Sequence, residues 1–391
     1  MARSYDIVLF GATGFAGELT AEYLAAHGPE GLKWALAGRS PAKLTAVRER
    51  LARASPACAE LPLIGADVSD PGSVRELATA ARVIVSTVGP YVRYGEPLVS
   101  ACAAAGTDYV DLTGEPEFVD TMYLRYHQLA ASTGARLIHS CGFDSIPADL
   151  GALFTVGRLP EGVPVTLSCF ARVSGTISGG TWHSTLEILG RLERARRVAR
   201  ERHELERWLN PIASDRVVRG ILGRPRYEDL EHGWIVPAPT IDPQNVLRSA
   251  RALDRYGPEF SYGHYLVTGS LPATVGVMAG VGGVAAVAHL RVGRNLLRKL
   301  HSPGEGPDLA KRARSFFRLR FAAETPDQRL ITEVSGGDPG YGETAKMLAE
   351  SALCLAFDGI EVGGGQVTSA VALGDKLIER LLRAGIQFVV V

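Results

Sequence analysis

The sequence contains little cysteine and no excess of charge of either sign. Its five cysteines are scattered over 391 residues, and no two of them are spaced as Cys-x-x-Cys. This pattern argues against a disulfide scaffold and against a zinc site built from cysteine. The 42 basic and 42 acidic residues cancel, so the overall charge gives no reason to expect a nucleic acid as partner. An anionic ligand therefore needs a local binding site.

Two further features are missing. The apolar run at residues 7–10 is too short for a secretory signal, so we expect a cytoplasmic protein. No Tyr-x-x-x-Lys occurs, which excludes the usual proton relay of short-chain dehydrogenases. The composition is otherwise ordinary, with 46% hydrophobic residues, and the length predicts two domains.

Strand and helix patterns alternate along the first third of the chain. A short apolar run typical of a buried strand, residues 7–10, is followed by helical spacing over residues 17–27. Further strands are predicted at residues 34–37, 63–66, 83–88, 109–112 and 136–140. This β-α-β-α order predicts an α/β fold, in which residues 1–145 form a Rossmann domain with a doubly wound parallel sheet.

After residue 145 the pattern changes to α+β. Residues 181–208 are charged and helical, and we expect their arginines on a solvated face. Residues 210–262 are rich in Pro, Gly and Tyr, which predicts irregular structure with short strands. A β-hairpin is predicted around residues 325–328, and a terminal helix over residues 370–384.

A glycine motif lies between the first predicted strand and the first predicted helix. It reads Gly11-Ala12-Thr13-Gly14-Phe15-Ala16-Gly17. Gly11 permits a tight turn, Gly14 lets backbone N–H groups approach a pyrophosphate, and Gly17 lets the helix pack against the strand. The helix N-terminus then faces the phosphates with its unpaired donors and its dipole. The motif in this context predicts a dinucleotide site.

The end of the second strand distinguishes NADP(H) from NAD(H). An NAD enzyme usually places Asp or Glu there to bind the ribose 2′-hydroxyl. This chain has Arg39 and Ser40 instead, with Lys43 one turn later. Arg39 can grip a 2′-phosphate through a bidentate fork, and Ser40 can donate its hydroxyl and cap the next helix. These residues predict NADP(H) as the cofactor, the alternative being that Arg39 is only a solvated loop residue.

Two more strand ends supply candidate contacts, because ligands bind at the carboxyl ends of the strands in open α/β sheets. Asp67 follows the third strand and can meet the adenine amine. Gly89, Pro90 and Tyr91 follow the fourth strand and can line the nicotinamide, since Gly89 allows close backbone approach and Pro90 fixes the turn.

Together these motifs resemble the saccharopine dehydrogenase-like oxidoreductases, and within that group the trans-acting enoyl reductases. The most specific match is the run Ser-Cys-Gly-Phe-Asp-Ser-Ile-Pro-Ala-Asp at residues 140–149. The resemblance implies a second α+β domain built on a mixed sheet over residues 146–340, for substrate binding and dimerisation. It also implies that residues 341–391 return to the Rossmann domain, and that NADPH reduces an acyl chain made by a polyketide synthase.

Two other functions stay open at this point. One is an NADP-linked amino-acid or imine dehydrogenase, which needs several convergent basic groups for a carboxylate ligand. The other is a non-catalytic NADP-binding protein.

An enoyl reductase needs a hydride at Cβ, a donor that polarises the thioester carbonyl, and a proton for Cα. Tyr91, Ser145 and His183 are candidates by residue type. Ser145 and Asp144 lie just past a predicted strand end, near the expected nicotinamide, although Ser145 can equally cap a helix. Cys141 is a possible nucleophile, but we expect no histidine to pair with it locally and interpret it as a buried thiol.

One long apolar run carries no formal charge. Residues 273–290 include four glycines and are followed by Arg291, Arg294, Arg298 and Lys299. Its length is at the lower limit for crossing a membrane. Three interpretations are open: a helix buried in the fold or in an interface, a surface over residues 273–299 that contacts a membrane or holds a lipid chain, and a membrane span.

Arg39→Ala tests the cofactor assignment. The substitution should weaken NADPH binding much more than NADH binding, because only NADPH carries the 2′-phosphate that the guanidinium would grip. Calorimetric titration of the wild type and the variant with both nucleotides measures the two losses. Equal losses would contradict the assignment.

Overall fold

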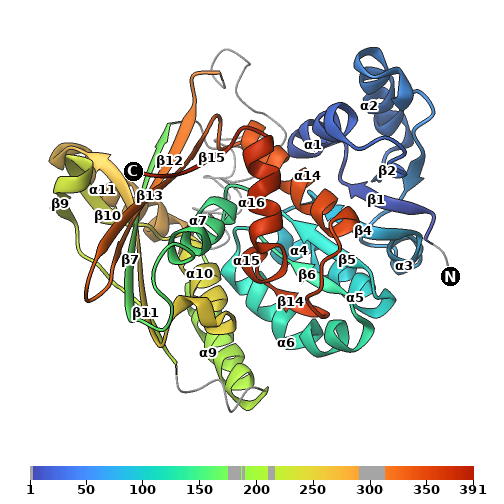
Figure 1. Cartoon of the computed structure of the whole chain (residues 1–391). Helices are drawn as coiled ribbons and strands as arrows, with labels where there is room; N and C mark the ends of the chain where they lie inside the picture. The colour runs from blue at the N-terminus through green and yellow to red at the C-terminus, as the bar shows by residue number, and fades with distance from the viewer. Residues whose placement is uncertain (1–2, 175–185, 187–189, 210–215, 290–312) are drawn as a thin grey trace.

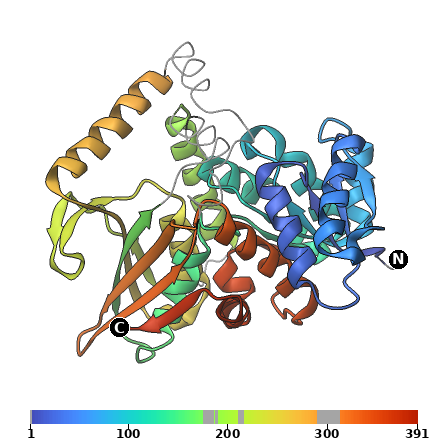
Figure 2. The same cartoon turned by 90° about the horizontal axis from the view of Figure 1, so that it is seen from above.

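The computed structural model describes residues 3–174, 186, 190–209, 216–289 and 313–391. Two β-sheets lie beside each other, with helices packed between them and around the first sheet (Figures 1 and 2). The first sheet is built from the N-terminal third of the chain plus one late strand. The second is built from the remainder.

The first sheet has the strand order of a doubly wound nucleotide-binding fold. All of its seven strands are parallel, and in spatial order they are β14 (Gly365–Val367), β6 (Arg136–Ile138), β5 (Asp108–Asp111), β4 (Ala81–Ser86), β1 (Tyr5–Phe10), β2 (Trp34–Gly38) and β3 (Leu63–Gly65). The connecting helices are α1 (Phe15–His27), α2 (Pro41–Ala54), α3 (Pro71–Ala80), α4 (Tyr91–Tyr94), α5 (Glu96–Ala105) and α6 (Pro116–Thr133). The order reverses between β1 and β4, where such sheets bind their ligands. The predicted Rossmann fold is confirmed.

The second sheet is mixed, as the resemblance implied. Its strands run in the order β15 (Gln387–Val390), β13 (Arg329–Gly336), β12 (Phe316–Glu324), β7 (Val165–Ser174), β11 (Glu259–Gly269), β10 (Gly233–Pro237) and β9 (Arg226–Glu228), with β8 (Val217–Gly220) beside β11. β11 is parallel to β7 and β8, whereas the other pairs are antiparallel. The predicted hairpin is the pair β12 and β13, which meets at Glu324 and Arg329.

The expectation of irregular structure over residues 210–262 was wrong in part. Helix α10 (Asp242–Ala252) forms there, and it begins with Asp242 and Pro243, which suit a first helical turn. Its buried positions include Asn245, Arg248 and Ser249. Because polar residues occupy that buried face, hydrophobic periodicity does not show the helix in the sequence.

The arginine-rich helix is not wholly solvated, which corrects a second expectation. α9 (Leu192–Leu209) packs against α6, and Arg202 on it is buried. The Arg202 guanidinium donates to Asp120 Oδ1 of α6 at 3.0 Å and also to Glu206. Burial of an arginine is tolerated here because carboxylates meet it from both helices.

The C-terminal segment contacts both sheets. α14 (Gly342–Phe357) packs on α1 and β4, and β14 then extends the first sheet beside β6. The predicted single terminal helix is two helices, α15 (Ser369–Ala372) and α16 (Gly374–Arg383), and the positive φ of Gly374 lies at the junction. β15 finally pairs with β13 of the second sheet.

A buried carboxylate joins these parts. Asp149 lies on α7 (Ile146–Val156) and is fully buried. It accepts hydrogen bonds from Ser249 Oγ of α10 at 2.5 Å, from Ser369 Oγ at 2.7 Å and from the Ala370 backbone N–H at 2.8 Å. One side chain therefore connects two helices of the second domain to the C-terminal segment.

The long apolar run forms helix α11 (Leu271–His289), and it is not buried in the described part of the fold. Most of its described side chains are exposed. Among the described residues, no helix has the length and hydropathy needed to cross a membrane.

Asp149→Ala should lower the free energy of unfolding by about 3 kcal/mol or more, because it leaves two hydroxyls and one N–H buried without their acceptor. Urea denaturation followed by circular dichroism measures this. Asp327→Ala, in the exposed turn between β12 and β13, is the matched control and should change stability by less than about 0.5 kcal/mol. Equal effects of the two substitutions would show that the Asp149 contacts contribute little.

Candidate cofactor and active site

The glycine turn joins β1 to α1 at the point where the strand order reverses. Gly11 has a φ of +89°, and a Cβ there would lie 2.7 Å from Thr87 Oγ1. A Cβ on Gly17 would lie 2.2 Å from the Gly11 carbonyl oxygen, so the helix meets the turn backbone to backbone. Ala12 is buried beneath this contact, whereas Phe15 packs its ring edge-on against Tyr341, with centroids 4.6 Å apart. The packing of Ala12, Phe15 and Gly17 therefore fixes the conformation of the turn.

Gly14 differs from the other two glycines because the fold has room for a side chain there. A Cβ on Gly14 would meet only the Gly11 carbonyl oxygen, at 3.4 Å, and Gly14 is exposed beside partly buried Thr13. Gly14 is the N-cap residue of α1 and has no side chain to cap it. The N-terminus of α1 is thus open to an external anion, which fits a pyrophosphate.

Arg39 and its neighbours lie at the end of β2, on the same edge of the sheet. Arg39 and Lys43 are exposed, and Arg39 makes no hydrogen bond or ion pair with another described residue. Ser40 caps α2 as predicted, accepting from the Lys43 backbone N–H at 3.4 Å. An exposed guanidinium that no described side chain engages fits a role in holding a 2′-phosphate.

Asp67 follows β3, and its carboxylate is hydrogen-bonded to a residue close in sequence. Its Oδ1 accepts from the backbone N–H and the hydroxyl of Ser69, each at 2.8 Å. These two hydrogen bonds, and to a smaller extent Arg39, lower the pKa of Asp67. The carboxylate therefore stays charged near Arg39, and an adenine contact for it remains a prediction.

The Tyr91 hydroxyl is hydrogen-bonded within the protein, which does not favour the catalytic role predicted for it from the sequence. Tyr91 follows Gly89 and Pro90, and its hydroxyl donates to the Ser86 carbonyl oxygen at 2.9 Å and accepts from the Leu112 N–H at 3.1 Å. Burial raises the pKa of this phenol well above its usual value. The hydroxyl instead ties the end of β4 to the end of β5, a use of tyrosine that its residue type does not reveal.

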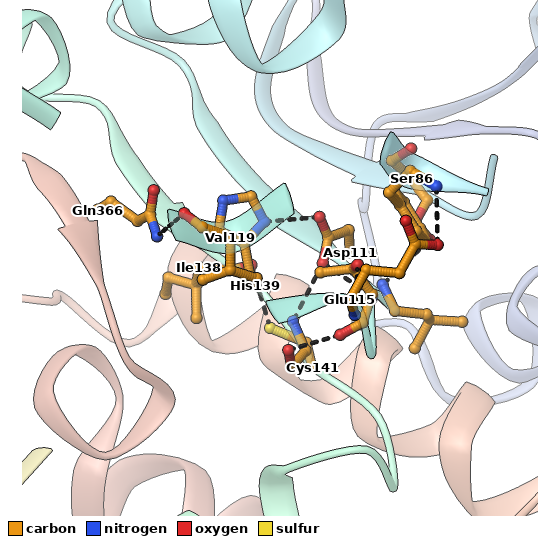
Figure 3. Close-up of polar contacts among 12 residues, drawn as sticks. Ser86, Asp111, Glu115, Val119, Ile138, His139, Cys141 and Gln366 are labelled. Atoms are coloured by element: carbon orange, nitrogen blue, oxygen red, sulfur yellow. Dashed lines mark hydrogen bonds and ion pairs between the residues drawn. The ribbon is translucent and has the colours of Figure 1, made fainter. Parts of the chain in front are cut away.

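A buried aspartate fixes the ends of β5 and β6 (Figure 3). Asp111 Oδ2 lies 2.7 Å from His139 Nδ1, and Oδ1 accepts from the backbone N–H groups of Ser140 and Thr113 at 3.0 and 3.1 Å. The Asp111 carbonyl oxygen accepts from the Cys141 N–H at 2.7 Å. Ser140 is held at a φ of +63°, which is uncommon for a residue other than glycine. Sequence reasoning missed Asp111 and His139, although both stand at predicted strand ends.

The segment after β6 brings a carboxyl group to the same edge of the sheet. Asp144 is half-buried, and its Oδ1 lies 3.1 Å from where a Cβ on Gly114 would be, so it lies beside the loop that follows β5. Burial, together with the charge of Asp242 at the start of α10, raises the pKa of Asp144 to about 7. Burial likewise raises the pKa of Asp242 to about 7. Two carboxyl groups from the two domains thus titrate near neutral pH.

The remaining candidates have mixed outcomes. Ser145 precedes α7 as predicted, but its side chain makes no capping bond, and its buried Oγ has no partner among the described residues. Cys141 is buried, and burial raises the pKa of its thiol well above the usual value, so it is not a ready nucleophile. His183 lies outside the described residues.

Comparison with known proteins agrees with this arrangement. Residues 7–138 match the family model described as the saccharopine dehydrogenase NADP binding domain. A Mycobacterium tuberculosis relative that carries the trans-acting enoyl reductase name is 40% identical, with 98% of this chain and 97% of the relative covered. The trans-acting enoyl reductase of Mycobacterium ulcerans is 36% identical over the same shares.

Among solved structures, apo saccharopine dehydrogenase (L-Glu forming) from Saccharomyces cerevisiae has a TM-score of 0.57 at 12% identity. The match covers 99% of this chain and 100% of that chain. At this identity the similarity concerns the fold.

Gly17→Ala and Gly14→Ala separate the packing role of the turn from its ligand role. Gly17→Ala should lower the free energy of unfolding of the cofactor-free protein by about 3 kcal/mol or more, since a Cβ there collides with backbone. Gly14→Ala should leave that stability nearly unchanged and weaken NADPH binding by roughly tenfold or more, because the methyl group stands where the pyrophosphate approaches.

Denaturation without nucleotide and calorimetry with NADPH measure the two effects. Gly363→Ala, in an exposed loop with open space at the Cβ position, is the control for both. Unchanged NADPH affinity in Gly14→Ala would contradict the placement of the pyrophosphate.

Proposed function

The chain belongs to the trans-acting enoyl reductase family and carries a saccharopine dehydrogenase NADP binding domain, and from this membership we propose that it reduces the α,β double bond of an acyl thioester with NADPH. The observation that carries the proposal is the position of Asp144. A carboxyl group that titrates near neutral pH lies at the same sheet edge as the glycine turn. Such a group is suited to general acid catalysis.

The cofactor would be held by groups already described. The open N-terminus of α1 and the turn around Gly14 would bind the pyrophosphate, and Arg39 would bind the 2′-phosphate. Bound in this way, NADPH supplies the hydride that Cβ of the enoyl group receives. The nicotinamide would then lie toward the ends of β4 and β5, where Gly89 and Pro90 line the edge.

The proton for Cα would come from Asp144. Hydride addition at Cβ moves the electron pair of the double bond toward the thioester carbonyl, and protonation at Cα restores that carbonyl and leaves a saturated chain. Asp144 is then a carboxylate and regains a proton from solvent. Because its pKa is about 7, a large fraction of the group is protonated at neutral pH.

A donor to the thioester carbonyl completes the proposed chemistry. Ser145 remains a candidate because its buried Oγ has no partner among the described residues, and it is next to Asp144 in the chain. His183 also stays a candidate for this donor. The relatives are named trans-acting, and we propose that the acyl substrate is likewise delivered by a separate protein, a polyketide synthase.

The amino-acid dehydrogenase alternative fits this edge of the sheet less well. A substrate with several carboxylates needs convergent cationic groups. The charged groups that raise the pKa of Asp144 are the carboxyl groups of Asp242, Asp111 and Glu115, and their negative charge opposes such a substrate. An uncharged acyl chain meets no such repulsion.

Asp144→Asn tests the proton donor. In the wild type, the rate of NADPH oxidation with a crotonyl thioester should fall as the pH rises through about 7, because the protonated form of Asp144 is lost. Asp144→Asn should lower kcat by roughly 10²-fold and remove that pH dependence, while NADPH affinity changes little.

Asp327→Asn, in an exposed turn, is the matched control. A wild-type pH profile in Asp144→Asn would exclude Asp144 as the donor. If no enoyl thioester, free or carried by a protein, caused the wild type to oxidise NADPH, the proposed function itself would be wrong.

A further inference from the structure

Helix α11 presents an apolar surface that no other described residue covers. Apart from Thr274, which is buried, most of its described side chains are exposed. The large exposed ones are Leu271 (48%), Val275 (58%), Met278 (52%), Val281 (43%) and Val287 (40%). The helix is drawn in orange in Figure 2, where it projects away from the two sheets. It contacts β10 and β11, and the Thr274 hydroxyl near its start lies 2.6 Å from the Thr268 hydroxyl of β11. An exposed apolar patch of this kind marks a site of interaction.

The apolar surface extends around the whole helix. Because successive residues of an α-helix are about 100° apart, Met278 and Val287 lie on opposite sides of α11. The sequence has no charged residue from Leu271 to Ala288, so the helix has no polar face. A protein partner that packs against one side would leave the other side in water. Lipid chains can surround all sides at once.

The composition of α11 also suits lipid better than water. Gly276, Gly280, Gly282 and Gly283 have open space where a Cβ would stand, and valines occupy many of the other positions. Glycine and valine are poor helix formers in water. In lipid, each backbone N–H and C=O must be paired within the segment, which favours the helix whatever its side chains.

The charge of the following sequence points to a type of lipid. Residues 290–300 carry Arg291, Arg294, Arg298 and Lys299 and no acidic residue. Cationic residues beside an apolar helix are attracted to anionic head groups. We propose that α11 inserts into one leaflet of a bilayer that contains anionic lipids, without crossing it. This proposal does not depend on the enoyl reductase function.

Vesicle flotation tests the proposal with the full chain. Vesicles of phosphatidylcholine mixed with phosphatidylglycerol should carry the wild type upward, and vesicles of phosphatidylcholine alone should carry less of it. The double variant Met278→Glu/Val281→Glu should lower the partition coefficient by roughly tenfold or more, because it places two carboxylates in the apolar surface. Val390→Glu, at an exposed valine of β15, is the control and should bind vesicles as the wild type does.

Circular dichroism and NADPH affinity show whether each variant is folded. We expect the double variant to fold, because Met278 and Val281 are exposed. Light scattering after size exclusion shows whether a second copy of the chain covers α11 instead of lipid. Wild type that stays out of both kinds of vesicle would overturn the proposal. A dimer that Met278→Glu/Val281→Glu dissociates, without any vesicle binding, would overturn it in favour of a second copy of the chain. Equal binding by the wild type and the double variant would show that α11 is not the inserted element.

Discussion

The candidate site depends on a contact between two stretches of backbone, the carbonyl of Gly11 and the start of α1 at Gly17. A Cβ at Gly17 would lie 2.2 Å from that oxygen, so α1 can approach the end of β1 this closely only without a side chain. The approach directs the helix N-terminus at the point where the strand order reverses. Arg39 at the end of β2 and Asp144 beyond β6 then lie along the same edge.

The second half of the chain is fixed to this edge by its C-terminal segment. α14 packs against α1, β14 extends the first sheet and β15 joins the second, so residues distant in sequence connect the two sheets. Asp149 adds a polar junction at the centre, where hydroxyls from α10 and α15 meet one carboxylate. This junction fixes the position of α10. Asp242 at the start of α10 is thereby held where its charge raises the pKa of Asp144. The proposed chemistry therefore requires both domains.

The sequence predicts the first domain well because its signals are local. Strands such as β1 and β2 are short, buried apolar runs, and the glycine motif requires one particular turn. The second domain is harder, since α10 buries polar residues such as Ser249 whose partners come from other parts of the chain. The engagement of the Tyr91 hydroxyl and the pKa of Asp144 arise from contacts between strand ends and domains. Residue type and spacing cannot supply those contacts.

A crystal structure of the protein with NADP⁺ would test the account most directly. We expect the pyrophosphate at the N-terminus of α1, the 2′-phosphate in contact with the Arg39 guanidinium, and the nicotinamide beside the end of β5 within reach of Asp144. A nucleotide bound elsewhere on the chain, or a nicotinamide directed away from Asp144, would contradict the account.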